Sequence, residues 1–169
     1  MKNLYFIILS CIVLLFYACK PKVDIEKETE VIKALINNET QAFLQNDTAK
    51  VLSYYVHDAF QTRLSADCDT VILYRGWREV SEYFKNINLD GFRNPRNTKD
   101  FIQIKVMDDA AWAIYKDTWT YDLVRNIPVP GGMKDTIITV SGNIFCTMNL
   151  EKKADEWKIS GFSLYSLNN

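Results

Sequence analysis

The chain has few of the residues that bind metals or carry redox chemistry. It contains one histidine, His57, and four cysteines, none of them in a Cys-X-X-Cys pair. Because zinc sites are built mainly from histidine and cysteine, we expect neither a metal nor a cofactor. The net charge is −1, from 20 basic and 21 acidic residues, so the basic excess typical of nucleic-acid-binding proteins is missing and no such partner is expected.

Glycine and proline are scarce, with six and four residues, and no internal repeat or low-complexity segment is present. A chain of this length without repeats is typical of one globular domain. Aromatic residues, by contrast, make up 13% of the sequence, enough for a well-filled core or a lined pocket.

The N-terminus predicts export. An apolar run from Leu4 to Tyr17 is too short for a comfortable membrane span, and Ala18-Cys19 follows it. A small residue before a cysteine resembles the lipobox of bacterial lipoproteins, so we expect lipidation at Cys19 and anchoring to a bacterial cell membrane, periplasmic or at the surface. An ordinary secretory signal, an uncleaved anchor and cleavage before Cys11 are the alternatives. The predicted divisions are a signal peptide at 1–18, a lipidated tether at 19–23 and one domain at 24–169.

Two cysteines remain in the predicted domain, Cys68 and Cys146. An exported compartment permits a disulfide between them. Their dissimilar sequence contexts favour the alternative of two separate buried thiols.

Apolar periodicity predicts a fold with helices first and strands last. Loops rich in Asn, Gly and Pro are expected at 90–99 and 128–132. The predicted helices are 25–43, 49–56 and 76–87, and the predicted strands are 59–64, 70–74, 101–107, 111–124, 135–150 and 157–165.

Several short phrases in this order resemble the nuclear transport factor 2-like superfamily, including its SnoaL-like and ketosteroid-isomerase-like branches. The phrases are Phe43 to Asp47, Tyr54 to Asp58, Arg75-Gly76-Trp77 and Trp157-Lys158-Ile159. The resemblance covers Ile25 to Tyr165. It implies an α+β fold, a cystatin-like roll in which a cone-shaped, curved antiparallel sheet wraps around three N-terminal helices and leaves a cavity.

The isomerase mechanism itself does not carry over. The resemblance aligns its tyrosine with Glu39, its general base with Arg63 and its second acid with Asn143. Arginine stays protonated and cannot act as a base, so we assign no catalytic residue. His57 and Asp58, which a dehydratase would use as an acid and base, are better explained by a histidine at the negative end of a helix.

The aligned residues predict a polar set in one cavity. Glu39, Arg63 and Asn143 would project into it, with Arg63 binding a carboxylate or phosphate. The alternatives are a Glu39–Arg63 ion pair or side chains that reach solvent at the mouth. Tyr55 and Trp112 are further cavity candidates.

The strand at 111–124 has two unlike faces. The resemblance places Trp112 and Ile114 inward, which puts Tyr115, Trp119 and Tyr121 on the outer face, around Asp117. Aromatic residues there suit a homodimer interface, with Asp117 paired across it. A slip of one residue would exchange the two faces and line the cavity with this row instead.

We therefore predict a non-catalytic lipoprotein that binds an unknown small apolar or anionic ligand and forms a homodimer. An isomerase- or dehydratase-type enzyme using a carboxylate such as Glu39 is the first alternative. The second is a protein-interaction module that uses the outer face of the sheet.

Overall fold

The computed structural model describes residues 23–66, 69–87, 92–130 and 132–167. The predicted signal peptide, Cys19 and Cys68 lie outside these residues, so export and lipidation stay predictions. No helix among the described residues is long and apolar enough to cross a membrane.

Three helices lie on one face of the sheet: α2 (Ile25–Leu44), α3 (Thr48–Ser53) and α4 (Gly76–Asn86). Asp24 caps α2 by accepting a hydrogen bond from the Lys27 amide at 3.1 Å, and Asp47 caps α3 by accepting one from the Lys50 amide at 3.0 Å. The prediction extended the second helix to 56 and was wrong there. The chain leaves the helix at Tyr54 because its backbone bonds to Ile159 in the last strand.

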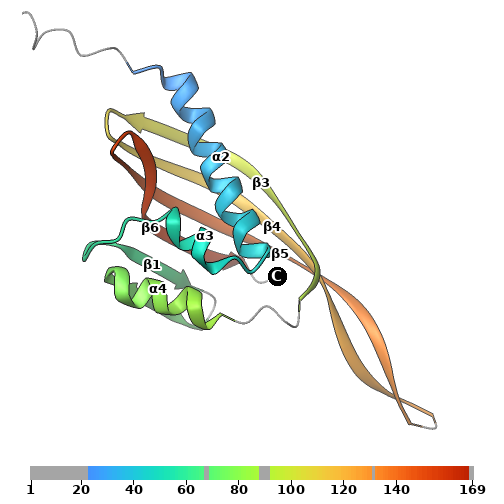
Figure 1. Cartoon of the computed structure of the whole chain (residues 1–169). Coiled ribbons are helices and arrows are strands. Elements are labelled where there is room, and N and C mark those ends of the chain that lie inside the picture. The colour runs from blue at the N-terminus through green and yellow to red at the C-terminus, as the bar shows by residue number, and fades with distance from the viewer. Residues whose placement is uncertain (1–22, 67–68, 88–91, 131, 168–169) are drawn as a thin grey trace, which may run out of the picture.

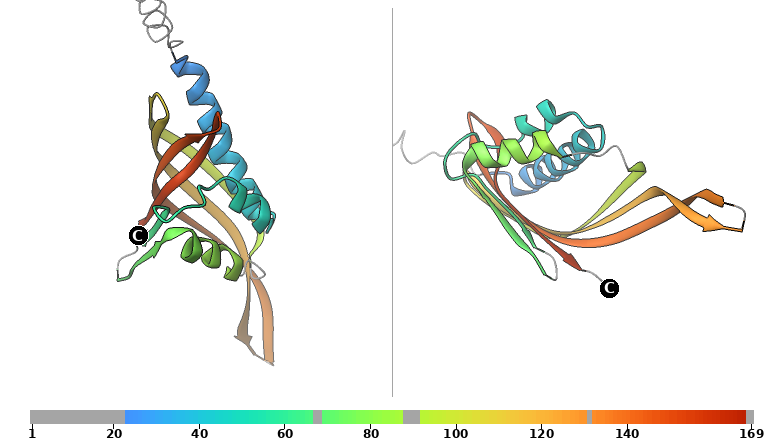
Figure 2. Two further views of the ribbon diagram at one scale, coloured as in Figure 1. Left: turned by 60° about the vertical axis from the view of Figure 1, so that its left-hand side comes forward. Right: turned by 90° about the horizontal axis from the view of Figure 1, so that it is seen from below.

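The sheet is curved, open and six-stranded, with the order β2-β1-β6-β5-β4-β3. Neighbouring strands are antiparallel except β1 and β6, which are parallel, so the expectation of a fully antiparallel sheet was wrong at that pairing. Figure 2 shows the helices over the concave face. The strands are β1 (Thr62–Ala66), β2 (Val71–Arg75), β3 (Arg93–Met107), β4 (Ala110–Val129), β5 (Gly132–Lys153) and β6 (Glu156–Leu167).

Both predicted loops are largely strand. β3 begins at Arg93 and includes Pro95, which an edge strand tolerates because its outer side needs no hydrogen bond. β4 and β5 stay paired as far as Val129 and Gly132, whereas the pairing of β3 with β4 ends at Asp122. The ends of β4 and β5 therefore project as a two-stranded arm (Figure 1).

The predicted orientation of β4 was wrong by one residue. Its buried residues are Ala111, Ala113, Tyr115 and Asp117, so Trp112 lies on the outer face. Side chains alternate between the two faces along a strand. Because the two small alanines are buried beneath the helices, Tyr115, Asp117, Trp119 and Tyr121 face the same way and point inward. The aromatic row expected at a dimer interface therefore faces the interior.

The start of α2 is tied to the far end of the sheet through Glu28. Its carboxylate accepts hydrogen bonds from Lys152 Nζ and Trp157 Nε1, both at 2.6 Å. The hydrogen bonds from Lys152 and Trp157 lower the pKa of Glu28 below its usual 4.5. This cluster joins α2 to the β5–β6 turn across more than a hundred residues of chain.

Replacing Glu28 by glutamine is expected to lower the free energy of unfolding at neutral pH by about 1–2 kcal/mol, since hydrogen bonds to a charged acceptor are lost. Because the folded pKa is lowered, the contribution of the carboxylate exists above the unfolded pKa and is lost as the pH falls through the folded value. Thermal unfolding from neutral to acidic pH should therefore show a difference that shrinks on acidification. Glu30→Gln removes only an exposed pair with Lys33 and serves as the control. Equal losses in the two variants would contradict the role of Glu28.

Candidate functional site

A pocket of about 740 Å³ lies between the helices and the concave face of the sheet. The C-terminal half of α2, the helix α4 and the strands β1, β4, β5 and β6 all contribute to its wall. The lining is mainly aromatic, with a few buried polar groups. The aromatic members are Phe43, Tyr83, Phe84, Phe92, Trp119, Tyr121 and Phe162.

Glu39 brings a buried carboxyl group from α2 into this wall. It is 6% exposed, and its Oε1 accepts a hydrogen bond from the Tyr55 hydroxyl at 2.9 Å. The Thr40 hydroxyl lies 3.4 Å from Oε2. Burial raises the pKa of Glu39 above its usual value, although the positive charge of Arg63 opposes this shift. Glu39 is thus a carboxyl group whose neutral form the fold favours.

Arg63 enters the pocket from β1 and is 5% exposed. Its Cζ lies 4.4 Å, 4.7 Å and 5.0 Å from the ring centroids of Tyr83, Phe162 and Phe84. Nη2 donates to the Tyr83 hydroxyl at 3.3 Å, while Nε and Nη1 have no hydrogen-bond partner among the described residues. The rings offset part of the cost of burying the charge, but two strong donors stay unsatisfied.

The structure brings Glu39 and Arg63 to one pocket, as predicted. The alternatives for this pair were wrong, because both side chains are buried and no ion pair within the described residues includes Arg63. Tyr55 lies behind Glu39 as its hydrogen-bond donor and is itself 2% exposed.

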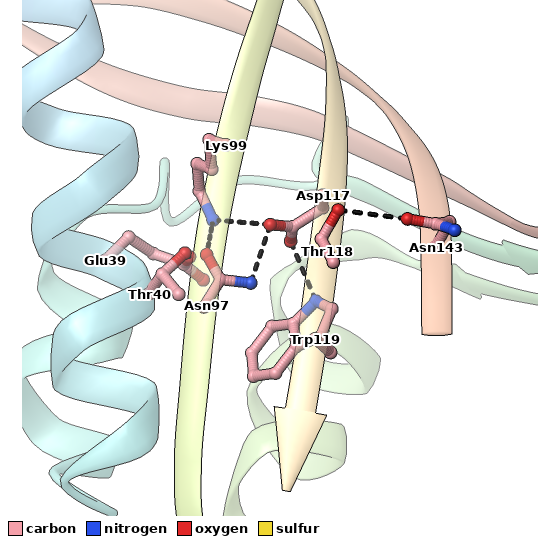
Figure 3. Close-up of polar contacts among 8 residues, drawn as sticks. All are labelled: Glu39, Thr40, Asn97, Lys99, Asp117, Thr118, Trp119 and Asn143. Carbon is pink, nitrogen blue, oxygen red and sulfur yellow. Dashed lines mark hydrogen bonds and ion pairs between the residues drawn. The ribbon is translucent and has the colours of Figure 1, made fainter. Parts of the chain in front are cut away.

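Asp117 and Lys99 form a second set of charged side chains at the pocket wall, and hydrogen bonds within this set satisfy the Asp117 carboxylate (Figure 3). Asp117 Oδ1 accepts from Lys99 Nζ at 3.0 Å and from Asn97 Nδ2 at 2.6 Å, while Oδ2 accepts from Trp119 Nε1 at 2.9 Å. The side chains of Lys99 and Asp117 are 2% and 6% exposed. The sequence predicted a partner for Asp117 across a dimer, but its partner is Lys99 of the same chain.

Three other predictions need correction. Trp112 is not a cavity residue, because it lies on the outer face of β4. Asn143 lines the pocket as predicted, but its Oδ1 accepts a hydrogen bond from the Thr118 hydroxyl at 3.0 Å, on the face opposite Asp117, so this oxygen already has a partner in the sheet. Of the proposed interface residues, Tyr115 is 1% exposed in the core, and Trp119 and Tyr121 line the pocket.

The sequence did not identify several residues that lie in or beside the pocket. Lys99 and Asn97 fell in a predicted loop, so nothing in the sequence suggested a pairing with Asp117. The closeness of Phe84 to Arg63 depends on the packing of α4 against β1, which the sequence pattern does not show. Tyr83 and Phe162 gave no separate signal.

Two other reactive side chains are His57, which does not line the pocket, and Cys146, which does. His57 Nε2 hydrogen-bonds the Leu52 carbonyl oxygen at 3.0 Å and the ring stacks on Trp77, which confirms the helix-end role predicted for it. Cys146 is a free thiol, and burial raises its pKa to about 12. Within the described residues, no group of three metal-binding side chains occurs.

The pairing of Lys99 with Asp117 generates a stability prediction. Asp117→Asn should destabilise the fold by about 3 kcal/mol or more, because it leaves the Lys99 charge buried without a counter-charge. Adding Lys99→Met should restore most of this loss, since the stranded charge is then removed. Chemical denaturation of the two variants measures both effects. A double variant as unstable as the single one would contradict the pairing.

Comparison with known proteins finds similarity at the level of the fold. No family model and no curated protein matches the sequence. A ketosteroid isomerase-like protein from Erwinia carotovora atroseptica is similar in structure at 14% identity and a TM-score of 0.58, covering 83% of this chain and 96% of that one.

Two further solved structures are similar. One is a protein from Novosphingobium aromaticivorans described as NTF2-like with a cystatin-like fold, at 12% identity and a TM-score of 0.59, covering 85% of this chain and 84% of the other. The second is a hexachlorocyclohexane dehydrochlorinase at 12% identity and a TM-score of 0.61, covering 84% and 86%. At these identities the likeness concerns the fold alone, and the chain has the nuclear transport factor 2-like α+β fold that the sequence predicted.

Proposed function

We propose that this chain binds one small, largely apolar molecule in the pocket, as a non-catalytic or accessory protein in the exported, lipid-anchored setting that the sequence predicts. The observation that carries the proposal is the aromatic pocket of about 740 Å³. Small-molecule sites are commonly mainly apolar clefts of about 300–1,000 Å³ with a few placed polar groups. Glu39, Arg63 and the Lys99–Asp117 pair are such groups here.

The open pocket favours this function over a protein-interaction module, for which a filled cavity is expected. The homodimer stays a proposal, but the residues proposed for its interface differ from those expected from the sequence. With Tyr115, Trp119 and Tyr121 facing inward, the outer sheet face instead carries Trp112 and Ile114 together with the exposed rings of Phe145 and Tyr165.

N-phenyl-1-naphthylamine, a neutral probe that fluoresces when buried in apolar surroundings, is expected to bind the protein with one site per chain. Gly142→Leu should weaken this binding by about tenfold, because Gly142 lines the pocket and a side chain there enters open space. Thr147→Leu adds a similar side chain to the opposite face of β5, beside the buried Cys146, and should leave the affinity unchanged. Equal binding by native chain and Gly142→Leu would contradict the proposed site.

A second candidate function is proton transfer by Glu39. Its support is a carboxyl group buried in an apolar pocket, with a raised pKa and a tyrosine donor at 2.9 Å. Carboxyl groups in such surroundings serve as general acids or bases near neutral pH. Similar structures include a ketosteroid isomerase-like protein and a dehydrochlorinase, which is compatible with this chemistry in the same fold.

The raised pKa of Glu39 predicts a pH-dependent effect of Glu39→Gln. Because the folded pKa exceeds the usual 4.5, the stabilising contribution of the neutral carboxyl is present at low pH and is lost as the pH rises through the folded value. In thermal unfolding, the permanently neutral glutamine should therefore gain stability relative to the native chain as the pH rises from about 4 through the folded pKa of Glu39. Glu30→Gln is again the surface control. A difference that does not change with pH would remove the basis for the proton-transfer function.

A further inference from the structure

Four buried acidic or basic side chains lie in the pocket wall or directly against it, and their arrangement leaves one of them uncompensated. Lys99 and Asp117 form a direct pair, and the remaining acceptor capacity of Asp117 is used by Asn97 and Trp119. This group therefore offers no free charge to a ligand. The other two groups are Glu39 and Arg63, which are not in direct contact as an ion pair.

Glu39 does not neutralise Arg63 in the way a salt bridge would. Its carboxyl group is held by Tyr55 and approached by Thr40 rather than by the guanidinium. Burial favours its neutral form, which would leave the pocket with one net positive charge on Arg63. Among the described residues, the Glu39 oxygens form no ion pair with Arg63.

The surroundings of Arg63 fit an anionic group better than a purely structural role. The residue is a member of the pocket wall, and its side chain is framed by three aromatic rings. Nε and Nη1 lack acceptors in the part of the chain that the structure describes. A buried guanidinium with unused donors costs free energy unless an anion completes it, and a carboxylate matches its planar donor geometry.

We propose that Arg63 is an anion subsite and that the ligand is an organic monocarboxylate with an apolar, ring-bearing body. The carboxylate binds the guanidinium, and the ring system lies against Phe43, Phe84 and Trp119. A single uncompensated cation suits a single negative charge better than a dianion such as a phosphate ester. The inference rests on the proposed binding function and names its ligand class.

The test compares two probes that differ only in charge, 2-naphthoate and 2-naphthamide. Each is titrated into isotope-labelled protein, and binding is followed through the indole N–H signal of Trp119, whose ring lines the pocket. The native chain is expected to bind 2-naphthoate at least about tenfold more tightly than 2-naphthamide, as charge-assisted hydrogen bonds predict. Arg63→Met should reduce this ratio to about one while retaining 2-naphthamide.

Two further variants test whether the preference for 2-naphthoate depends on Arg63 itself. Arg78→Met removes one positive charge from an exposed position on α4 and should leave the ratio unchanged. Arg63→Lys keeps the charge with fewer donors and should retain part of the preference, which also provides a test if Arg63→Met does not fold.

The outcomes separate the two proposals. A tenfold preference that disappears only in Arg63 variants supports the anion subsite. Equal affinity for both probes in the native chain, or a preference that survives in Arg63→Met, overturns the subsite and leaves the binding function standing. Failure of both probes to shift the Trp119 signal overturns the binding function and the subsite together.

Discussion

The position of α2 across the concave face of the sheet is the constraint on which both the core and the pocket depend. Its N-terminal end is held by Glu28 to Lys152 and Trp157, and its middle is buried through Ile32 and Ile36. These contacts determine where the C-terminal half of the helix lies. That half places Glu39 and Phe43 in the pocket wall. The contacts of Glu28 at the start of the helix therefore help to position the pocket residues near its end.

The sheet supplies the rest of the wall through its curvature and its side-chain alternation. Near the helices, β4 presents the small residues Ala111 and Ala113, which allow close packing. Farther along the same face, Asp117 and Trp119 meet open space and line the cavity. One strand thus closes the core at one end and lines the pocket at the other.

The buried polar groups divide into a structural and a functional set. The Lys99–Asp117 pair is fully hydrogen-bonded, which is how a buried ion pair avoids a large desolvation penalty. Glu39 and Arg63 lack such mutual pairing, although both are as deeply buried. Proteins retain buried polar groups without full hydrogen bonding chiefly at functional sites. This contrast therefore favours a role for Arg63 in ligand binding over a purely structural one.

The sequence by itself determined the order of the elements, because helical and strand periodicities are local properties of the chain. It also identified Glu39 and Arg63 as neighbours in one cavity, through the resemblance to a known fold. Tertiary structure decided which face of β4 is buried. Both faces of this strand carry apolar residues, so its alternating pattern is compatible with either orientation until the helices pack on one face. It also decided the partner of Asp117, the extension of β3 past Pro95 and the parallel pairing of β1 with β6. Each of these depends on contacts between segments far apart in the chain, which local patterns do not encode.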